Sequence, residues 1–180
     1  MPKILENVKD NILNTARDMI LVEGLNSISI RELALRCNIS TGTIYNYFDS
    51  KQDLVISIAW KEWYSTLNRM DYSNNTDLDY MEKLKIIFLE IKSFLNIVHN
   101  MQYGEFFDTI GIEKLMKITK NKKDLHDVLS NKVFDALSES NISKQDPLVC
   151  GIIIKLYCSY ALSSDVGFEE LKPHIEKLIH

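Results

Sequence analysis

Apolar residues recur every three or four positions along most of this chain, a spacing typical of amphipathic helices. The first such segment has its apolar face on Ile4, Leu5, Val8, Ile12, Leu13, Ala16, Met19 and Ile20. Gly24 predicts its end, because glycine often terminates helices. The same spacing predicts further helices over residues 51–70, 76–100, 102–110, 112–120, 124–140, 146–162 and 168–179. No Asn-Gly or Asp-Gly hairpin signal interrupts them, so an all-α fold is expected.

Polar residues mark several of the helix boundaries. Ser50 is followed three residues later by Asp53, the spacing of a capping box, which predicts that a long helix begins there. The polar run DYSNNTD at residues 71–77 predicts a break in the chain, with the next helix starting at its end. Asp146-Pro147 predicts another helix start, since proline is tolerated in the first turn.

Two short helices are predicted between residues 29 and 47. Ser29 and Glu32 have the spacing of a reciprocal capping box, and Ser40 is placed to cap the segment 41–47 after the turn Cys37-Asn38-Ile39. Two helices across so short a turn form a helix-turn-helix, whose second helix fits a DNA major groove. The residues expected to close a three-helix core with the first segment are Ile28, Ile30, Leu33, Ala34, Ile39, Ile44 and Phe48.

The sequence ISTGTIYNYFDSK, from Ile39 to Lys51, resembles the DNA-binding signature of TetR-type (TetR/AcrR) transcriptional regulators. That signature runs valine or isoleucine, serine, any residue, glycine or alanine, threonine, leucine or isoleucine, tyrosine, any residue, tyrosine or histidine, and phenylalanine, then a short turn and lysine. The resemblance implies a helix-turn-helix domain at residues 1–50 and a larger helical effector-binding and dimerisation domain at residues 51–180. It also implies that Ser29, Arg31, Thr43, Tyr45, Tyr47 and Lys51 occupy DNA-contacting positions.

The side chains of the second short helix suit contact with DNA. Thr41, Thr43 and Asn46 are small enough to enter a groove, and the Asn46 amide matches an adenine edge. Gly42 lets DNA approach the backbone closely. The full predicted DNA-binding set is Ser29, Arg31, Ser40, Thr41, Gly42, Thr43, Tyr45, Asn46, Tyr47 and Lys51. Because residues 41–47 include no Lys or Arg, few phosphate contacts and a shallow dependence of affinity on salt are expected.

The net charge of −4 argues against a protein that coats nucleic acid indiscriminately. Residues 1–51 hold six Lys/Arg against six Asp/Glu, so this segment is neutral and remains compatible with contact to phosphate. The three cysteines lie in apolar helical contexts, which predicts reduced and buried thiols. Neither a basic-then-apolar leader nor an apolar run near ~20 residues is present, so a cytoplasmic protein is expected.

Large aromatic side chains are concentrated in the middle of the chain. Such residues at helical spacing form ordinary core in many proteins, and the resemblance favours instead an apolar effector cavity with a few polar groups. The residues predicted to line it are Trp60, Trp63, Tyr64, Phe88, His99, Tyr103, Phe106 and Phe107.

The segment 146–162 is apolar on more than one stripe, which a helix at a monomer's surface would not tolerate. Pairing of the helices at 124–140 and 146–162 with a second copy would bury this excess in a four-helix bundle, matching the interface that the resemblance implies. The alternative is that 146–162 is the central core helix of a monomer.

The function expected is that of a ligand-responsive homodimeric repressor, which binds a near-palindromic operator and is released by a small apolar or amphipathic effector. No enzyme activity, metal or cofactor is expected, because the four histidines show no ligand-like spacing with one another or with a cysteine. Two alternatives are a helical enzyme or cofactor protein, and an interaction protein that kept this fold but lost DNA binding.

Overall fold

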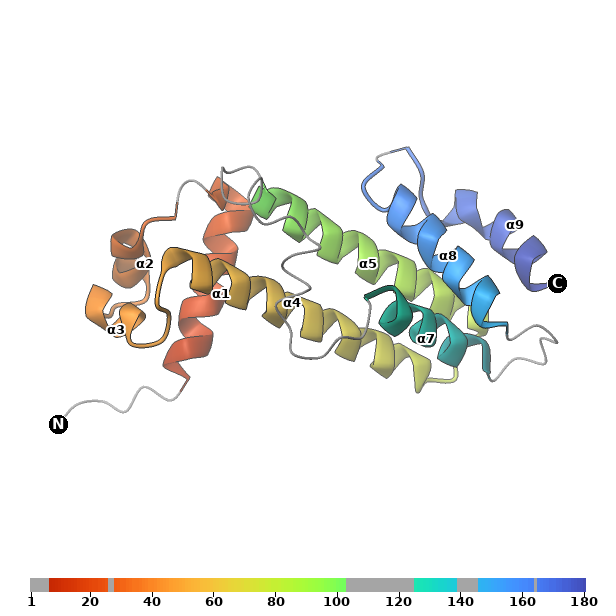
Figure 1. Cartoon of the computed structure of the whole chain (residues 1–180), viewed down its shortest axis with the longest axis horizontal. Coiled ribbons are helices and arrows are strands. Elements are labelled where there is room, and N and C mark those ends of the chain that lie inside the picture. Colours follow the sequence, from red (N-terminus) through yellow and green to blue (C-terminus); the bar gives the residue numbers. More distant parts are fainter. Residues whose placement is uncertain (1–6, 26–27, 103–124, 139–145, 164) are drawn as a thin grey trace. The chain divides into compact units, whose positions relative to one another are not determined.

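The computed structural model describes residues 7–25, 28–102, 125–138, 146–163 and 165–180 (Figure 1). Within them every regular element longer than one turn is an α-helix, which confirms the all-α prediction. The helices are α1 (Val8–Glu23), α2 (Ile30–Arg36), α3 (Thr41–Tyr45), α4 (Lys51–Asn74), α5 (Tyr80–Gln102), α7 (Leu125–Ser138), α8 (Pro147–Tyr160) and α9 (Phe168–Ile179). The helices predicted at 102–110 and 112–120 lie almost entirely outside the described residues.

Two compact units make up the chain. The first comprises Met1–Glu62 with Ile97–Leu115, and the second comprises Trp63–Asn96 with Met116–His180. The division falls within α4, because the first turns of this helix pack with α1, α2 and α3. The functional boundary expected at residues 50/51 therefore stays a prediction.

The core of the second unit is built around α5. Phe88 is fully buried, and its ring centroid lies 5.2 Å from that of Tyr157 in α8 and 6.2 Å from that of Phe168 in α9. The Tyr157 hydroxyl donates to the carbonyl of Leu84 at 3.1 Å. Burial raises the pKa of Tyr157 well above its usual range, so this phenol remains a hydrogen-bond donor.

The structure corrects the break predicted at residues 71–77, because α4 continues through Asn74. The polar residues of this run find partners in α7: Asp71 pairs with the Lys132 ammonium, and the Asn74 amide donates to the Lys132 carbonyl at 3.0 Å. The next helix begins at Tyr80, with the Asp79 carboxylate accepting from the amides of the following turn. Sequence alone could not reveal partners contributed by a helix so far along the chain.

α7 packs along α8, and His126 of α7 lies against Gly151 of α8. The His126 Nε2 atom of α7 lies 3.2 Å from the Gly151 carbonyl oxygen. A Cβ atom at position 151 would lie 3.1 Å from His126 Cε1, so a larger residue would force the histidine to move. The predicted start of α8 is confirmed, with Asp146 as the N-cap and Pro147 in the first turn.

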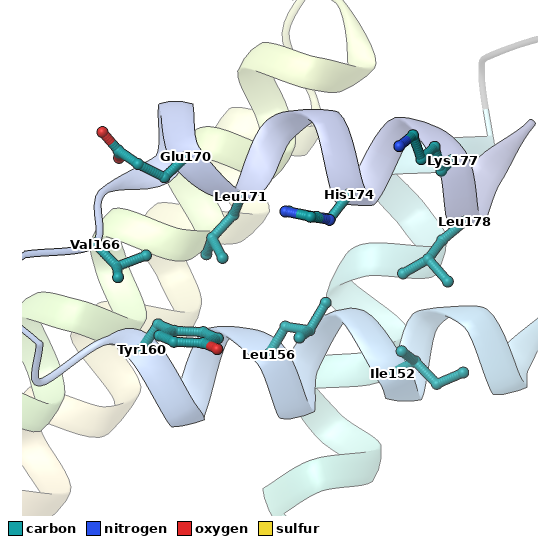
Figure 2. A pocket seen from close by; sticks show the side chains of 9 residues that line it. All are labelled: Ile152, Leu156, Tyr160, Val166, Glu170, Leu171, His174, Lys177 and Leu178. Carbon is teal, nitrogen blue, oxygen red and sulfur yellow. The ribbon is translucent and has the colours of Figure 1, made fainter.

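An open groove of about 560 Å³ runs between α8 and α9 (Figure 2). Its α8 wall carries side chains at four-residue spacing, and its α9 wall carries a mixture of apolar and charged groups. The lining residues are Ile152, Leu156, Tyr160, Val166, Glu170, Leu171, His174, Lys177 and Leu178.

The prediction that all three cysteines are buried is wrong for one of them. Cys37 and Cys150 are buried, whereas Cys158 is exposed, and none forms a disulfide. Cys158 lies three or four residues from Lys155 and Leu162, which are both exposed, and so occupies the outer side of this helical segment.

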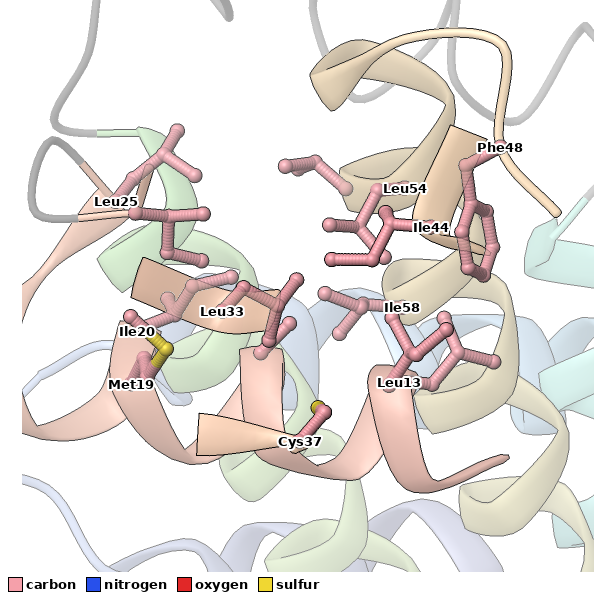
Figure 3. Close-up of a cluster of buried hydrophobic side chains, with 14 of the residues drawn as sticks. Leu13, Met19, Ile20, Leu25, Leu33, Cys37, Ile44, Phe48, Leu54 and Ile58 are labelled. Carbon is pink, nitrogen blue, oxygen red and sulfur yellow. The ribbon is translucent and has the colours of Figure 1, made fainter. Parts of the chain in front are cut away.

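The first unit has a core shared by four helices (Figure 3). Ile20 of α1, Leu33 of α2, Ile44 of α3 and Leu54 of α4 are each fully buried. The predicted core residues Ile28, Leu33, Ala34, Ile44 and Phe48 are confirmed as buried, while Ile30 and Ile39 are half-buried and pack against them. These buried contacts hold the short α3 helix against α1, α2 and α4.

No helix within the described residues is both long and apolar enough to cross a membrane.

Candidate nucleic-acid interface

A tight turn sets α3 against α2. Asn38 has φ 54°, in the left-handed region that asparagine tolerates better than most residues. The Asn38 amide donates to the Leu35 carbonyl at 3.1 Å, and the Ile39 amide donates to the Ala34 carbonyl at 3.0 Å. These bonds close the end of α2 and turn the chain into α3, giving the helix-turn-helix that the sequence predicts.

Both short helices begin at the predicted serine caps. Ser29 Oγ accepts from the Glu32 amide at 3.0 Å, and Ser40 Oγ accepts from the Thr43 amide at 3.0 Å. The Glu32 carboxylate accepts from Arg36 Nε at 3.0 Å, a pairing that the capping-box prediction did not include. Ser40 Oγ also lies 2.9 Å from Thr43 Oγ1, so these two hydroxyls are held together.

The recognition helix α3 is anchored on one side and exposed on the other. Ile44 and Phe48 are 0% and 2% exposed, which confirms their predicted place in the core. Tyr45 and Tyr47 are 54% and 43% exposed, and Thr41 is also exposed. The segment therefore presents tyrosine and threonine hydroxyl groups outward, as a groove-binding edge requires.

α3 is shorter than the predicted segment 41–47. It ends at Tyr45 with Asn46 as its C-cap, and the amides of Tyr47 and Phe48 both donate to the Ile44 carbonyl at 3.0 Å. The chain thus tightens into a turn that keeps Phe48 buried while Asn46 and Tyr47 remain exposed.

Gly42 is exposed, and packing within the chain does not require glycine at this position. A Cβ atom there would meet only Ser40 Oγ, at the ordinary contact distance of 3.6 Å. The structure therefore leaves room for a side chain at position 42, and the role of Gly42 in DNA binding stays a prediction.

Ion pairs occupy three cations of the first unit. Arg17 pairs with Glu62 at 2.5 Å, Arg36 pairs with Glu23 and Glu32 at 2.8 and 3.0 Å, and Lys61 pairs with Asp10 at 2.6 Å. A carboxylate already bound to a cation reduces what that cation offers to phosphate.

The two basic residues of the predicted DNA-binding set form no such ion pair within the part of the chain that the structure describes. Arg31 is exposed and forms no ion pair with any described carboxylate. The Lys51 ammonium donates to the Leu25 carbonyl at 3.3 Å, and partial burial lowers the pKa of Lys51. Lys51 therefore ties the start of α4 to the chain segment before α2.

The residues predicted to bind the effector differ in how deeply they are buried. Phe88 and Trp63 make core contacts, with the Trp63 ring centroid 5.2 Å from that of Phe94. Trp60 is half-buried, whereas Tyr64 and His99 are exposed. Tyr103, Phe106 and Phe107 lie outside the described residues. The effector site stays a prediction, and the groove between α8 and α9 is lined by none of these residues.

Among the described residues, no group of three or more His, Cys, Asp or Glu side chains is arranged to hold a metal ion.

Comparison with known proteins agrees with this geometry. The family model described as bacterial regulatory proteins, tetR family, matches residues 12–58. The HTH-type transcriptional regulator UidR of Escherichia coli K12 is 22% identical over 171 residues, covering 91% of this chain and 83% of UidR. The HTH-type regulator YuxN of Bacillus subtilis is 31% identical over 113 residues, which is 59% of this chain but only 38% of YuxN.

A solved structure supports the same fold over nearly the whole chain. The transcriptional regulator FadR from Bacillus subtilis, in complex with stearoyl-CoA, superposes with a TM-score of 0.56 and 18% identity, covering 95% of this chain and 97% of that one. The family consists of regulators and not of enzymes. The helix-turn-helix at residues 12–58 therefore matches that of the bacterial regulatory proteins of the tetR family, and the relatives matched over most of the chain are HTH-type transcriptional regulators.

Proposed function

We propose that this regulator is a cytoplasmic homodimeric repressor that binds a near-palindromic operator and releases it when a small apolar or amphipathic effector binds. The observation that carries the DNA-binding part is the outward edge of α3, where Tyr45 and Tyr47 are exposed while Ile44 and Phe48 are buried beneath them. A helix fixed in this way can enter a major groove without rearrangement.

Within that interface, small polar side chains would meet bases, and hydroxyls and cations would meet phosphates. Thr41, Thr43 and Asn46 are the candidates for base contact, and Gly42 lets the backbone approach. Ser29, Arg31, Ser40, Tyr45, Tyr47 and Lys51 are the candidates for phosphate contact.

An uncovered apolar stripe on α8 supports a two-fold dimer. Leu148, Ile152, Leu156 and Tyr160 follow one another at four-residue spacing, and Leu148 and Tyr160 are 69% and 39% exposed. A second copy laid on this stripe and on α9 would bury it, and would present two recognition helices to one operator.

The partner helix in this dimer differs from the one expected from sequence. The exposed positions of α7 are Asp127, Asn131, Asp135 and Ser138, and all four are polar. α9 instead contributes apolar residues to the groove, so we propose α8 and α9 as the paired helices.

An acyl conjugate is the first effector class to test. The FadR structure from Bacillus subtilis holds stearoyl-CoA, an amphipathic molecule. Effector bound among the aromatic residues near α4 and α5 would act through α4, whose first turn carries Lys51. A typical coupling of roughly 1–3 kcal/mol would weaken operator binding about 5- to 150-fold.

Binding-site selection with the full chain and a random duplex library tests the proposal. A recovered motif with two inverted half-sites is expected, and acyl-CoA added to the complex should lower its affinity. The double substitution Tyr47→Ala with Lys51→Ala should abolish the gel shift. Tyr72→Ala is the matched control, because Tyr72 is 77% exposed but lies in the second unit.

Each part of the proposal can fail separately. Recovery of no motif would favour an interaction protein that lost DNA binding. A motif that no tested acyl-CoA weakens would remove this effector class and leave the DNA-binding role intact.

A further inference from the structure

We infer that Lys9, a residue outside the helix-turn-helix, binds a DNA phosphate beside the end of the recognition helix. This inference rests on the proposed DNA-binding function and adds a contact that the recognition segment itself lacks. Lys9 lies in the first turn of α1, and its Nζ atom is 5.7 Å from the centroid of the Phe48 ring. Phe48 closes the turn after α3, so the fold brings an ammonium group to this turn.

Lys9 carries a positive charge that no described carboxylate balances. Arg17, Arg36 and Lys61 of the same unit are each held by carboxylates. Lys9 is exposed, and its ammonium group lies over the aromatic face of Phe48. A phosphate anion is a stronger partner for an ammonium than an aromatic face, so Lys9 could bind phosphate without breaking an ion pair.

The two acidic residues next in sequence to Lys9 and Phe48 form no ion pair with Lys9 among the described residues. Asp10 follows Lys9 in the sequence, but its carboxylate is bound by the Lys61 ammonium at 2.6 Å. Asp49 follows Phe48 in the sequence, and the structure shows no ion pair between the Asp49 carboxylate and the Lys9 ammonium.

The salt dependence of DNA binding tests this contact directly. Lys9→Met keeps most of the aliphatic stem over Phe48 and removes the charge, whereas Lys9→Arg keeps a cation there. Affinity of the full chain is measured between about 50 and 200 mM salt, for the selected operator and for a mixed-sequence duplex. In Lys9→Met the slope of log affinity against log salt should become shallower by about 0.9 for each bound protomer.

Two features separate a phosphate contact from a general charge effect. Lys9→Met should weaken operator and mixed-sequence DNA by the same factor, because phosphates carry no sequence information. Lys85→Met is the matched control, since it removes one positive charge from the second unit, and it should leave the slope unchanged. Lys9→Arg should restore the wild-type slope.

Neutral methylphosphonates placed one at a time along the operator would locate the contact. One position in each half-site should weaken wild-type binding and have no further effect on Lys9→Met. An unchanged salt slope in Lys9→Met, or equal sensitivity to every methylphosphonate in both proteins, would overturn the inference. Failure of the wild-type chain to bind any duplex would overturn the proposed function and this inference together.

Discussion

The two compact units present their exposed surfaces in opposite ways. In the first, α3 buries Ile44 and exposes hydroxyl-bearing side chains such as Tyr45. In the second, α8 buries one apolar side and leaves a second apolar stripe, including Leu148 and Leu156, at least partly exposed among the described residues. A polar surface fixed by local caps is complete within one chain, whereas an exposed apolar surface favours cover by another molecule, as in the proposed dimer.

The largest effect is expected from a charge placed on the α8 stripe. Leu156→Lys should convert the proposed dimer to a monomer, because an ammonium would have to be buried without a partner. Loss of the second recognition helix should lower operator affinity about 10²- to 10⁴-fold. Sedimentation velocity and gel shift measure the two effects. Ser159→Lys is the control, since Ser159 is exposed on α8 and does not line the groove.

A smaller but still large effect is expected from weakening the support of α3. Ile44→Ala removes a fully buried side chain and should lower the free energy of unfolding by about 2–5 kcal/mol. Thermal and denaturant unfolding measure this loss. Val22→Ala is a matched control, because Val22 is 82% exposed on α1 and its truncation should change little. Equal effects of the two substitutions would contradict the view that Ile44 anchors the recognition helix.

A change at the α3 cap separates folding from DNA contact. Ser40→Ala should cost about 1 kcal/mol of unfolding free energy, because the Thr43 amide loses its side-chain acceptor and keeps only the Ser40 carbonyl. Ser40→Asp should keep the cap and the stability, yet weaken DNA binding by placing a carboxylate near phosphate. If Ser40→Asp binds DNA as tightly as the wild type, Ser40 lies away from the phosphates.

The smallest effect concerns an ion pair of the second unit. The Lys85 ammonium, 2.6 Å from the Glu169 carboxylate, holds the pKa of Glu169 below its ordinary value of 4.5. The stabilisation is therefore present above pH 4.5 and is lost as the pH falls through the lowered pKa. Glu169→Gln should be slightly less stable than the wild type at pH 7 and equally stable near pH 2, by denaturant unfolding. A constant difference between the two proteins across this pH range would contradict this assignment.

Local signals made the first unit more predictable than the second. The caps at Ser29 and Ser40 depend on hydrogen bonds that span three residues, so the sequence alone indicates them. The polar run after residue 70 appeared to be a break because its partner, Lys132, belongs to a distant helix.

Burial that depends on packing was harder to predict. The exposure of Cys158 depends on which side of its helical segment the rest of the unit covers. Lys9 was overlooked for a similar reason, since its position beside Phe48 follows from the fold and not from any motif.

The brevity of α3 limits how much sequence each half of the operator can specify. Five helical residues rise about 7.5 Å, which is about two base-pair steps along a duplex. Each half-site would then hold only a few strictly required bases, and discrimination among genomic sites would depend on the interval between the halves. Inserting or deleting one base pair at the operator centre would then disrupt binding more than most single-base changes within a half-site.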